Sequence, residues 1–226
     1  MSIDNRPEIL LLSLDYLEFL DDVYASLFDK LAKSARVKRV KTANAALRYL
    51  DDNNPRAIII TDQGLTDCSH HEVLRKVQTH IRYGGLAIIG LHFPNSVTWD
   101  VFGSFFAFGF GLPWKPADYT RNNFNVNPSC VLPEGVKLSM LPVPPYTKVL
   151  HVKGARPHER ILVPVTYPDS ESLGSSEGIS EEENEDEIQA AVTGARLGSG
   201  YLVYCGNVNP EEAIDRIILS LCGLQL

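Results

Sequence analysis

The chain has 226 residues, of which 44% are apolar, 22% charged and 9% aromatic. This length suits one large domain or two small ones, and the composition excludes collagen-like, disulfide-scaffold and wholly disordered proteins. No apolar run reaches the roughly 20 residues that cross a bilayer, and the first residues lack the features of a secretory signal. We therefore expect a cytoplasmic or nuclear protein with no membrane partner.

The net charge of −7 comes from one segment of the chain. Between Asp169 and Glu187 there are nine acidic residues and no basic one, and the rest of the chain has 19 acids against 21 Lys and Arg. Residues 173–187 are rich in Ser, Gly and Glu and have too few apolar side chains to fold. We predict that 169–187 is an acidic disordered loop within a single domain, 1–226. No basic patch interleaved with aromatic residues stands out, so we expect no nucleic-acid partner.

The cysteines and histidines indicate neither a disulfide framework nor a metal site. The four cysteines have no CxxC spacing, which suggests buried thiols in a reducing compartment. His70 and His71 lie at a predicted helix start without a third ligand at suitable spacing. We expect no metal and no cofactor. The four cysteines are Cys68, Cys130, Cys205 and Cys222.

The first 92 residues alternate short apolar runs with amphipathic helical patterns. Such alternation predicts a parallel sheet, because short parallel strands need helical crossovers. The apolar runs are continuous, which is typical of a sheet covered on both faces. The predicted strands are 8–14, 37–41, 57–61 and 86–91, and the predicted helices are 16–33, 43–52 and 71–83.

After Phe93 the pattern changes. Five Phe and three Gly crowd the segment 99–114, which predicts a helix over 98–106 entering an aromatic, Gly-rich loop. This aromatic segment suits a core lid or a pocket wall equally well. The predicted elements that follow are an extended Pro-rich chain at 128–145, two antiparallel strands at 148–152 and 160–165 across a turn at 154–158, a hairpin of strands 188–196 and 201–205, and a helix at 211–221.

Two short segments carry a family resemblance. Residues 83–92 (YGGLAIIGLH) form a helix end with Gly-Gly, an apolar strand and a Gly-x-His. Residues 195–206 (ARLGSGYLVYCG) form a Gly-x-Gly turn followed by an aromatic strand. Both resemble the class I glutamine amidotransferase-like superfamily, in its ThuA-like (trehalose-utilisation) branch. The resemblance implies an α/β fold: a flavodoxin-like parallel sheet flanked by helices, with an antiparallel C-terminal extension.

The resemblance also shows which catalytic positions are substituted. Class I amidotransferases place a nucleophilic Cys in a sharp turn after such a Gly-x pair, and a His-Pro-Glu near the end of the domain. Here His92 stands at the Cys position and Asn209-Pro210-Glu211 replaces His-Pro-Glu. An imidazole cannot supply the thiolate, and Asn cannot accept the proton, so we do not expect glutamine hydrolysis by that route. The Asp62-Gln63-Gly64 turn matches the family's oxyanion-binding segment, and we expect its backbone N–H groups to suit an anion.

These positions define the candidate site at the carboxyl ends of the strands. Each has a structural alternative: His92 as a hydrogen-bonded histidine, and Asp62 and Asp15 as caps of the following helices. We expect His92, Asp62 and Glu211 to face one crevice. The candidate catalytic residues are His92, Glu211 and Asp62, and the candidate binding residues are Gln63, Gly64, His92, Trp99 and Asn209.

Three hypotheses for function follow. The first is a non-catalytic amidotransferase-like domain, a binding or interaction module whose partner is another protein or a second copy of the chain. The second is a ThuA-like enzyme or binding protein for a carbohydrate or related small polar molecule. The third is a subunit of a larger assembly that docks through the acidic loop. A filled or apolar crevice at the strand ends favours the first, whereas a polar pocket shared by His92, Asp62 and Glu211 favours the second.

Overall fold

The computed structural model describes residues 4–165 and 188–224, so the predicted loop 169–187 lies outside the described residues. The strands are β1 (Glu8–Leu12), β2 (Arg36–Val40), β3 (Ala57–Ile60), β4 (Leu86–Ile89), β5 (Lys115–Asn122), β6 (Phe124–Val126), β7 (Thr147–Lys153), β8 (Arg160–Pro164), β9 (Val192–Leu197) and β10 (Gly200–Cys205). The α-helices are α1 (Leu20–Val23), α2 (Ala25–Ser34), α3 (Ala43–Asp52), α4 (His71–Arg82), α5 (Phe93–Ser96), α6 (Trp99–Phe110) and α7 (Glu212–Leu221).

Eight strands form the central sheet in the order β2-β1-β3-β4-β10-β9-β8-β6. The first five are parallel, and their order is that of a flavodoxin-like, doubly wound sheet. The last three extend it through antiparallel pairs. This confirms the α/β fold class and the antiparallel extension. The helices that cover both faces come from the connections between the parallel strands and, for α7, from the chain after β10.

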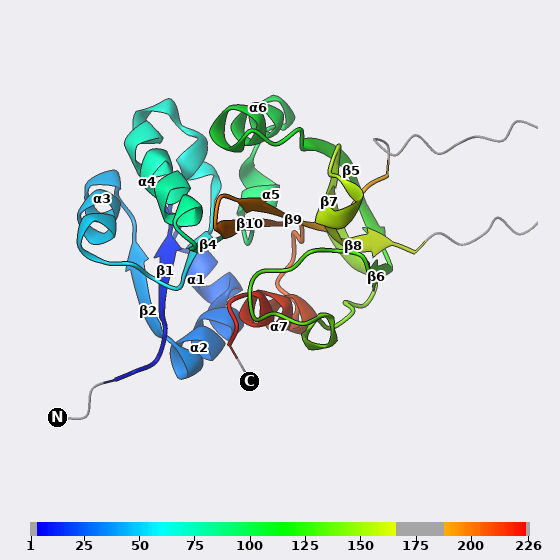
Figure 1. Ribbon diagram of the computed structural model, residues 1–226, viewed down its shortest axis with the longest axis horizontal. Helices are drawn as coiled ribbons and strands as arrows, with labels where there is room; N and C mark the ends of the chain where they lie inside the picture. The colour runs from blue at the N-terminus through cyan, green and yellow to red at the C-terminus, as the bar shows by residue number, and fades with distance from the viewer. Residues whose placement is uncertain (1–3, 166–187, 225–226) are drawn as a thin grey trace, which may run out of the picture.

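The helices form two layers, with α1, α2 and α7 on one face and α3, α4 and α6 on the other (Figure 1). Strand β1 shows why both layers are needed, because its buried side chains alternate between the two cores. Ile9 and Leu11 pack with the first layer, and Leu10 and Leu12 pack with the second. In the described part of the chain, no helix has the length and apolar character that crossing a membrane requires. All four cysteines are free; Cys205 and Cys222 are buried, whereas Cys68 is exposed.

The predicted β9–β10 hairpin is confirmed, but the predicted pairing of 148–152 with 160–165 is wrong. Strand β7 pairs with β5 in a separate two-stranded sheet, and β8 pairs with β6 and β9. The intervening turn directs β7 away from β8: Gly154 has a φ of +77°, and a Cβ there would lie 2.5 Å from the carbonyl oxygen of Pro113. Strands β5 and β6, absent from the sequence prediction, supply the true partners.

Helix α6 continues past the predicted end at 106 to Phe110 and stops at Gly111, whose φ is +67°. Each helical Gly costs about 1 kcal/mol relative to Ala, whereas burying one Phe contributes about 1.5–3 kcal/mol. Phe102 and Phe106 are completely buried and contact the rings of Phe93 and Tyr204. Aromatic packing therefore outweighs the glycines and keeps the segment helical as a lid over the core.

The close approach of β10 to β4 gives a stability prediction. A Cβ at Gly200 would lie 2.1 Å from the carbonyl oxygen of Ile81 and 2.2 Å from that of Gly85, both of them backbone atoms. We expect Gly200→Ala to lower the free energy of unfolding by about 1–3 kcal/mol, the usual cost of overpacking, as measured by urea denaturation. The control is Gly103→Ala in α6, where nothing lies within 4 Å; it should be neutral or stabilising by up to about 1 kcal/mol. Equal effects at the two positions would contradict the tight strand contact.

Candidate functional site

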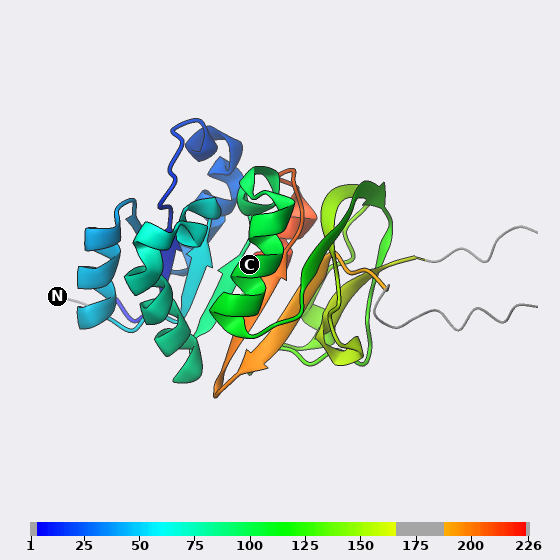
Figure 2. The ribbon, with the colours of Figure 1, turned by 90° about the horizontal axis from the view of Figure 1, so that it is seen from above.

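The carboxyl ends of the parallel strands lie at one edge of the sheet, opposite the β9–β10 turn (Figure 2). Every predicted site residue except Trp99 lies in a turn at this edge or at the start of the helix that follows it. Trp99 begins α6 and is 56% exposed. The topology therefore gathers the predicted residues at the same edge, and their side-chain contacts decide what the edge can do.

Asp62 follows β3 and is 1% exposed. Its Oδ1 accepts hydrogen bonds from the backbone N–H groups of Asp15 and Gly64, both at 3.0 Å, and its Oδ2 lies 3.0 Å from the hydroxyl of Thr61. Burial raises the pKa of the carboxyl group, although these hydrogen bonds act in the opposite direction. Asp62 thus ties the turn after β3 to the turn after β1, in the capping role that we considered as its alternative.

The same contacts bear on the predicted anion site. The N–H of Gly64 is already donated to Asp62, and the side chain of Gln63 donates to Asp15 Oδ2 at 3.1 Å. A Cβ at Gly64 would lie 2.5 Å from the backbone nitrogen of Asp15, so the turn packs directly on the turn after β1. An anion here would meet the carboxylates of Asp15 and Asp62 and an N–H group that already donates a hydrogen bond. The turn is therefore a poor oxyanion site.

The turn after β4 has an unusual backbone, but at Leu91 rather than at His92. Leu91 has a φ of +56°, the only positive φ of a non-glycine residue in the described chain; such residues cost energy and often mark sharp functional turns. The Leu91 side chain is 4% exposed and packs in the core. His92 has ordinary helical angles. The sharpest point of this turn therefore carries an apolar side chain that cannot take part in acid–base or nucleophilic chemistry.

His92 lies beside the acidic turns. Its backbone N–H donates to the carbonyl of Thr61 at 2.9 Å, and its half-buried ring packs edge-on against Phe19, with 5.8 Å between the ring centroids. Burial lowers the pKa of the imidazole, whereas the charges of Asp62 and Asp15 raise it; burial dominates. The structure thus brings His92 and Asp62 together and favours a neutral ring.

Glu211 faces a different partner. It precedes α7 without capping it through its side chain, and its Oε1 accepts a hydrogen bond from the hydroxyl of Thr147 on β7 at 2.7 Å. Its other carboxylate oxygen and the amide oxygen of Asn207 are buried and have no hydrogen-bond partner among the described residues. The acidic groups that act on His92 are Asp62 and Asp15, so the shared pocket with Glu211 stays a prediction.

A small cavity lies at this edge, bounded by α2, α7 and the turns after β4 and β10. The cavity there has a volume of about 10 Å³, roughly the room that one water molecule needs. Leu91 and Cys205 line it together with Asn207, Asn209 and Pro210. Nearby, the amide of Asn95 donates to the carbonyl of Val208 at 2.8 Å, which ties the turn after β4 to the chain after β10. The cavity beside Leu91 is too small for a substrate molecule.

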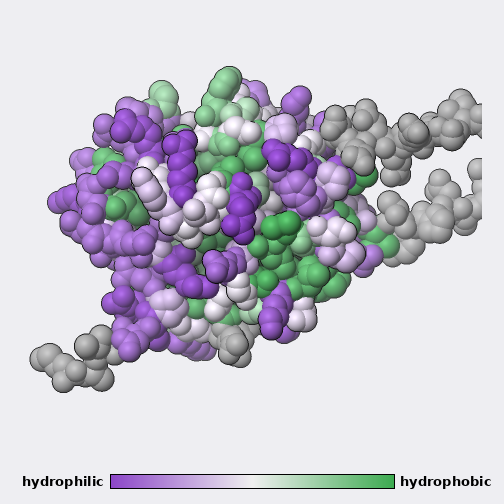
Figure 3. Space-filling view, in the orientation of Figure 1, coloured by the Kyte–Doolittle hydropathy of each residue, from purple (hydrophilic) through white to green (hydrophobic). Residues whose placement is uncertain are grey.

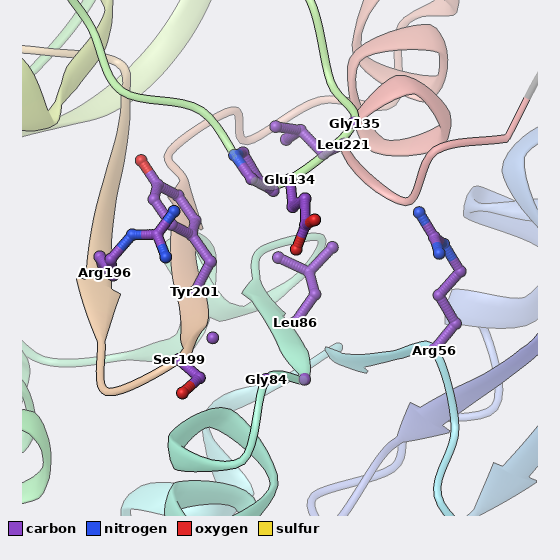
Figure 4. Close-up of a pocket in the computed structure, with 12 residues that line it drawn as sticks. Arg56, Gly84, Leu86, Glu134, Gly135, Arg196, Ser199, Tyr201 and Leu221 are labelled. Atoms are coloured by element: carbon purple, nitrogen blue, oxygen red, sulfur yellow. The ribbon is translucent and has the colours of Figure 1, made fainter.

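A much larger cavity, of about 350 Å³, lies at the opposite edge of the sheet, beside the amino ends of β4 and β10 (Figure 4). Sequence reasoning missed it because it considered only the carboxyl ends. The available signal was that both segments of the family resemblance, 83–92 and 195–206, contribute to it. Its charged and hydroxyl-bearing side chains are Arg56, Glu134, Arg196, Ser199 and Tyr201.

A third hollow, of about 480 Å³, separates α4 from α6 and is lined by both apolar and polar side chains. It includes the exposed Cys68, whose carbonyl lies 3.2 Å from Nδ1 of His71, and Phe108, which is 90% exposed. Asp67 accepts a hydrogen bond from the N–H of Ser69. In the described part of the chain, no group of His, Cys, Asp and Glu side chains could hold a metal ion.

Comparison with known proteins shows the fold alone. No family model matches the chain, and no curated protein does. Among solved structures, a β-galactosidase from Rahnella sp. R3 is 12% identical with a TM-score of 0.50, covering 97% of this chain and 31% of that one. A β-galactosidase from the Antarctic haloarchaeon Halorubrum lacusprofundi is also 12% identical, with a TM-score of 0.49 and 97% and 30% coverage. The chain spans less than a third of each enzyme's length.

The buried carboxyl group of Asp62 predicts a pH dependence. Its ordinary pKa is 3.8 and burial raises it, so the folded state keeps this proton to a higher pH than the unfolded state does. The free energy of unfolding should therefore fall as pH rises from about 4 through the raised pKa. In Asp62→Asn the amide oxygen can still accept both N–H groups, so we expect the variant to gain stability relative to wild type across this interval.

Urea denaturation at a series of pH values measures this difference. The matched control is Asp29→Asn, which removes an exposed carboxylate on α2. A stability difference between wild type and Asp62→Asn that stays constant with pH would show that burial does not control this carboxyl group.

Proposed function

We propose that this chain is a non-catalytic amidotransferase-like domain that acts as a binding or interaction module. The observation that supports it most directly is Leu91, an apolar, buried side chain at the sharpest point of the turn after β4. Acyl transfer of this kind needs a nucleophile at the turn and a base within hydrogen-bond reach of it. The cavity beside Leu91 has a volume of only about 10 Å³, and the Leu91 side chain itself supplies no reactive group.

The cysteines support the same proposal. Burial raises the pKa of Cys205 and of Cys222 to about 12, so both thiols are protonated at neutral pH, and a protonated thiol is a poor nucleophile. Cys68 is exposed on a loop after β3. Its nearest histidine contact is through its own carbonyl group rather than its thiol, which does not activate sulfur.

An interaction role has support on the surface. Figure 3 shows hydrophobic side chains gathered over the loop between β6 and β7, whereas hydrophilic ones cover the side of α2, β2 and α3. The loop exposes Val131, Leu138 and Val143 by 42%, 38% and 55%. Exposed apolar side chains that gather in one area mark contact surfaces more often than scattered ones do.

We predict that the purified chain releases no ammonia from glutamine above the background of buffer. A coupled glutamate-formation assay measures this, with Cys68→Ala as the variant that removes the exposed thiol. Turnover that disappears with a single cysteine would identify a relocated nucleophile. Turnover that survives the loss of all four would reveal another chemistry, and either outcome contradicts the proposal.

A ThuA-like enzyme or sugar-binding protein is the second candidate, and His92 favours it. A half-buried, neutral imidazole beside Asp62 and Asp15 is suited to acid–base work. The exposed rings of Phe19 and Trp99 supply apolar faces near the same edge. The likeness to β-galactosidase structures carries only the fold, so the edge residues must be tested directly.

We expect His92→Ala to lower the free energy of unfolding by less than about 1 kcal/mol. The ring is half-exposed and forms no hydrogen bond with another described residue. Titration of the chain with trehalose or galactose, followed by NMR, should leave the amide signals of residues 91–96 unchanged. Shifts there that disappear in His92→Ala would favour the second candidate over the first.

A further inference from the structure

The cavity at the amino edge has walls from five separate parts of the chain, of which α7 contributes Leu221. Gly84 to Leu86 form its floor, the β9–β10 hairpin one side, and Arg56 the other. The segment from Pro133 to Gly135 crosses above (Figure 4). A volume of about 350 Å³ falls within the range of small-molecule sites.

The cavity has an excess of positive charge. Arg56 and Arg196 stand on opposite sides, and the Glu134 side chain lies between them above Leu86 (Figure 4). In the part of the chain that the structure describes, neither the Arg196 guanidinium nor the Glu134 carboxylate forms an ion pair or hydrogen bond. Arg56 donates Nε to the carbonyl of Cys222 at 2.8 Å, which fixes the side chain and leaves its other N–H groups available. Guanidinium groups bind carboxylate and phosphate in preference to neutral groups.

Glycines keep the cavity open. Gly84 and Gly135 have positive φ values, of +104° and +81°, with nothing within 4 Å of an added Cβ. Gly85 and Gly200 lie so close to their neighbours that a Cβ would meet other atoms at 2.1 Å. Gly84 and Gly85 add no side chain to the floor beside Leu86, so a ligand can approach the backbone there more closely than larger residues would allow.

The walls are fixed before any ligand binds. The N–H of Tyr201 donates to the carbonyl of Gly85 at 3.0 Å, and that of Ser199 to the carbonyl of Arg82 at 3.1 Å. The Tyr201 hydroxyl donates to the carbonyl of Val131, which ties the crossing segment to β10. A preformed site loses less conformational entropy on binding than a flexible one.

We propose that this cavity binds a small hydroxylated organic anion. Arg196 holds the carboxylate or phosphate group, Arg56 adds a second positive charge, and Glu134 accepts a hydrogen bond from a hydroxyl of the same molecule. A neutral sugar lacks the first interaction, and a bare inorganic anion lacks the third. The site lies at the opposite edge of the sheet from Leu91, so its test is independent of the glutaminase test.

Calorimetric titration of the full chain at low salt provides the experiment, with gluconate as the carboxylate probe, glucose 6-phosphate as the phosphate probe and glucose as the neutral one. We expect one or both anions to bind and glucose to bind at least about tenfold more weakly. Arg196→Gln should weaken anion binding about tenfold or more, as expected for a lost charged hydrogen bond. Glu134→Ala, which removes the hydrogen-bond acceptor, should retain binding of inorganic phosphate while reducing the preference for hydroxylated anions.

Arg48→Gln is the matched control, because it removes an exposed arginine from α3 and should leave binding unchanged. Binding of gluconate alone or glucose 6-phosphate alone identifies which anionic group the site accepts, and both outcomes support the proposal. Absence of binding by both anions, equal binding of glucose, or equal losses in Arg196→Gln and Arg48→Gln would overturn it.

Discussion

The parallel pairing of β10 with β4 is the contact on which the rest of the structure depends. It brings Tyr201–Tyr204 beside Leu86–Ile89, so the end of the chain occupies the middle of the sheet. The contact is close at both ends: a Cβ at Gly90 would lie 3.1 Å from Cys205 Cβ, and one at Gly200 would collide with Gly85. The residues that flank this strand pair line the cavities at both edges of the sheet.

At the carboxyl edge, the residue that follows β4 and Gly90, Leu91, packs into the core. Leu91 takes a costly left-handed conformation and still directs its side chain into the core, where it helps to leave only about 10 Å³ free. Strain of this kind persists when surrounding contacts determine the backbone. The turn retains its sharp shape without a reactive group, and the neighbouring polar side chains mostly bond to the protein itself.

Periodicity predicted the first four strands and their helices because each is a local pattern with its own apolar face. Strand β5 (KPADYTRN) has one buried residue among eight, so no alternation marks it, and its pairing with β7 depends on chain 30 residues away. Without β5, the nearest partner for β7 in the sequence was β8. Helix α6 was predicted too short because local glycine penalties were visible, whereas the burial of Phe102 and Phe106 is a tertiary effect.

The candidate site likewise has a part that local sequence patterns predict and a part that depends on tertiary contacts. The sequence placed Asp62, His92 and Glu211 at one edge through the general rule for parallel strands, but the partner of Glu211 is Thr147, on a strand from the second half of the chain. Two sides of the amino-edge cavity come from the segments 83–92 and 195–206, which the sequence had singled out, but the irregular segment around Glu134 that completes it carries no local pattern. That segment is placed by tertiary hydrogen bonds, such as Tyr201 to Val131 and Ser220 to Met140.

Electrostatics explains why the two edges cannot serve the same ligand. Asp15, Asp62 and Glu211 give the carboxyl edge three carboxyl groups, which oppose the approach of an anion and leave room only for a hydroxyl or a cationic donor. The amino edge has two arginines against the single carboxylate of Glu134. In doubly wound folds the strand carboxyl ends usually hold the ligand, yet here that end is acidic and its cavity is small. The two arginines and the cavity volume at the amino edge both support the proposed anion site there.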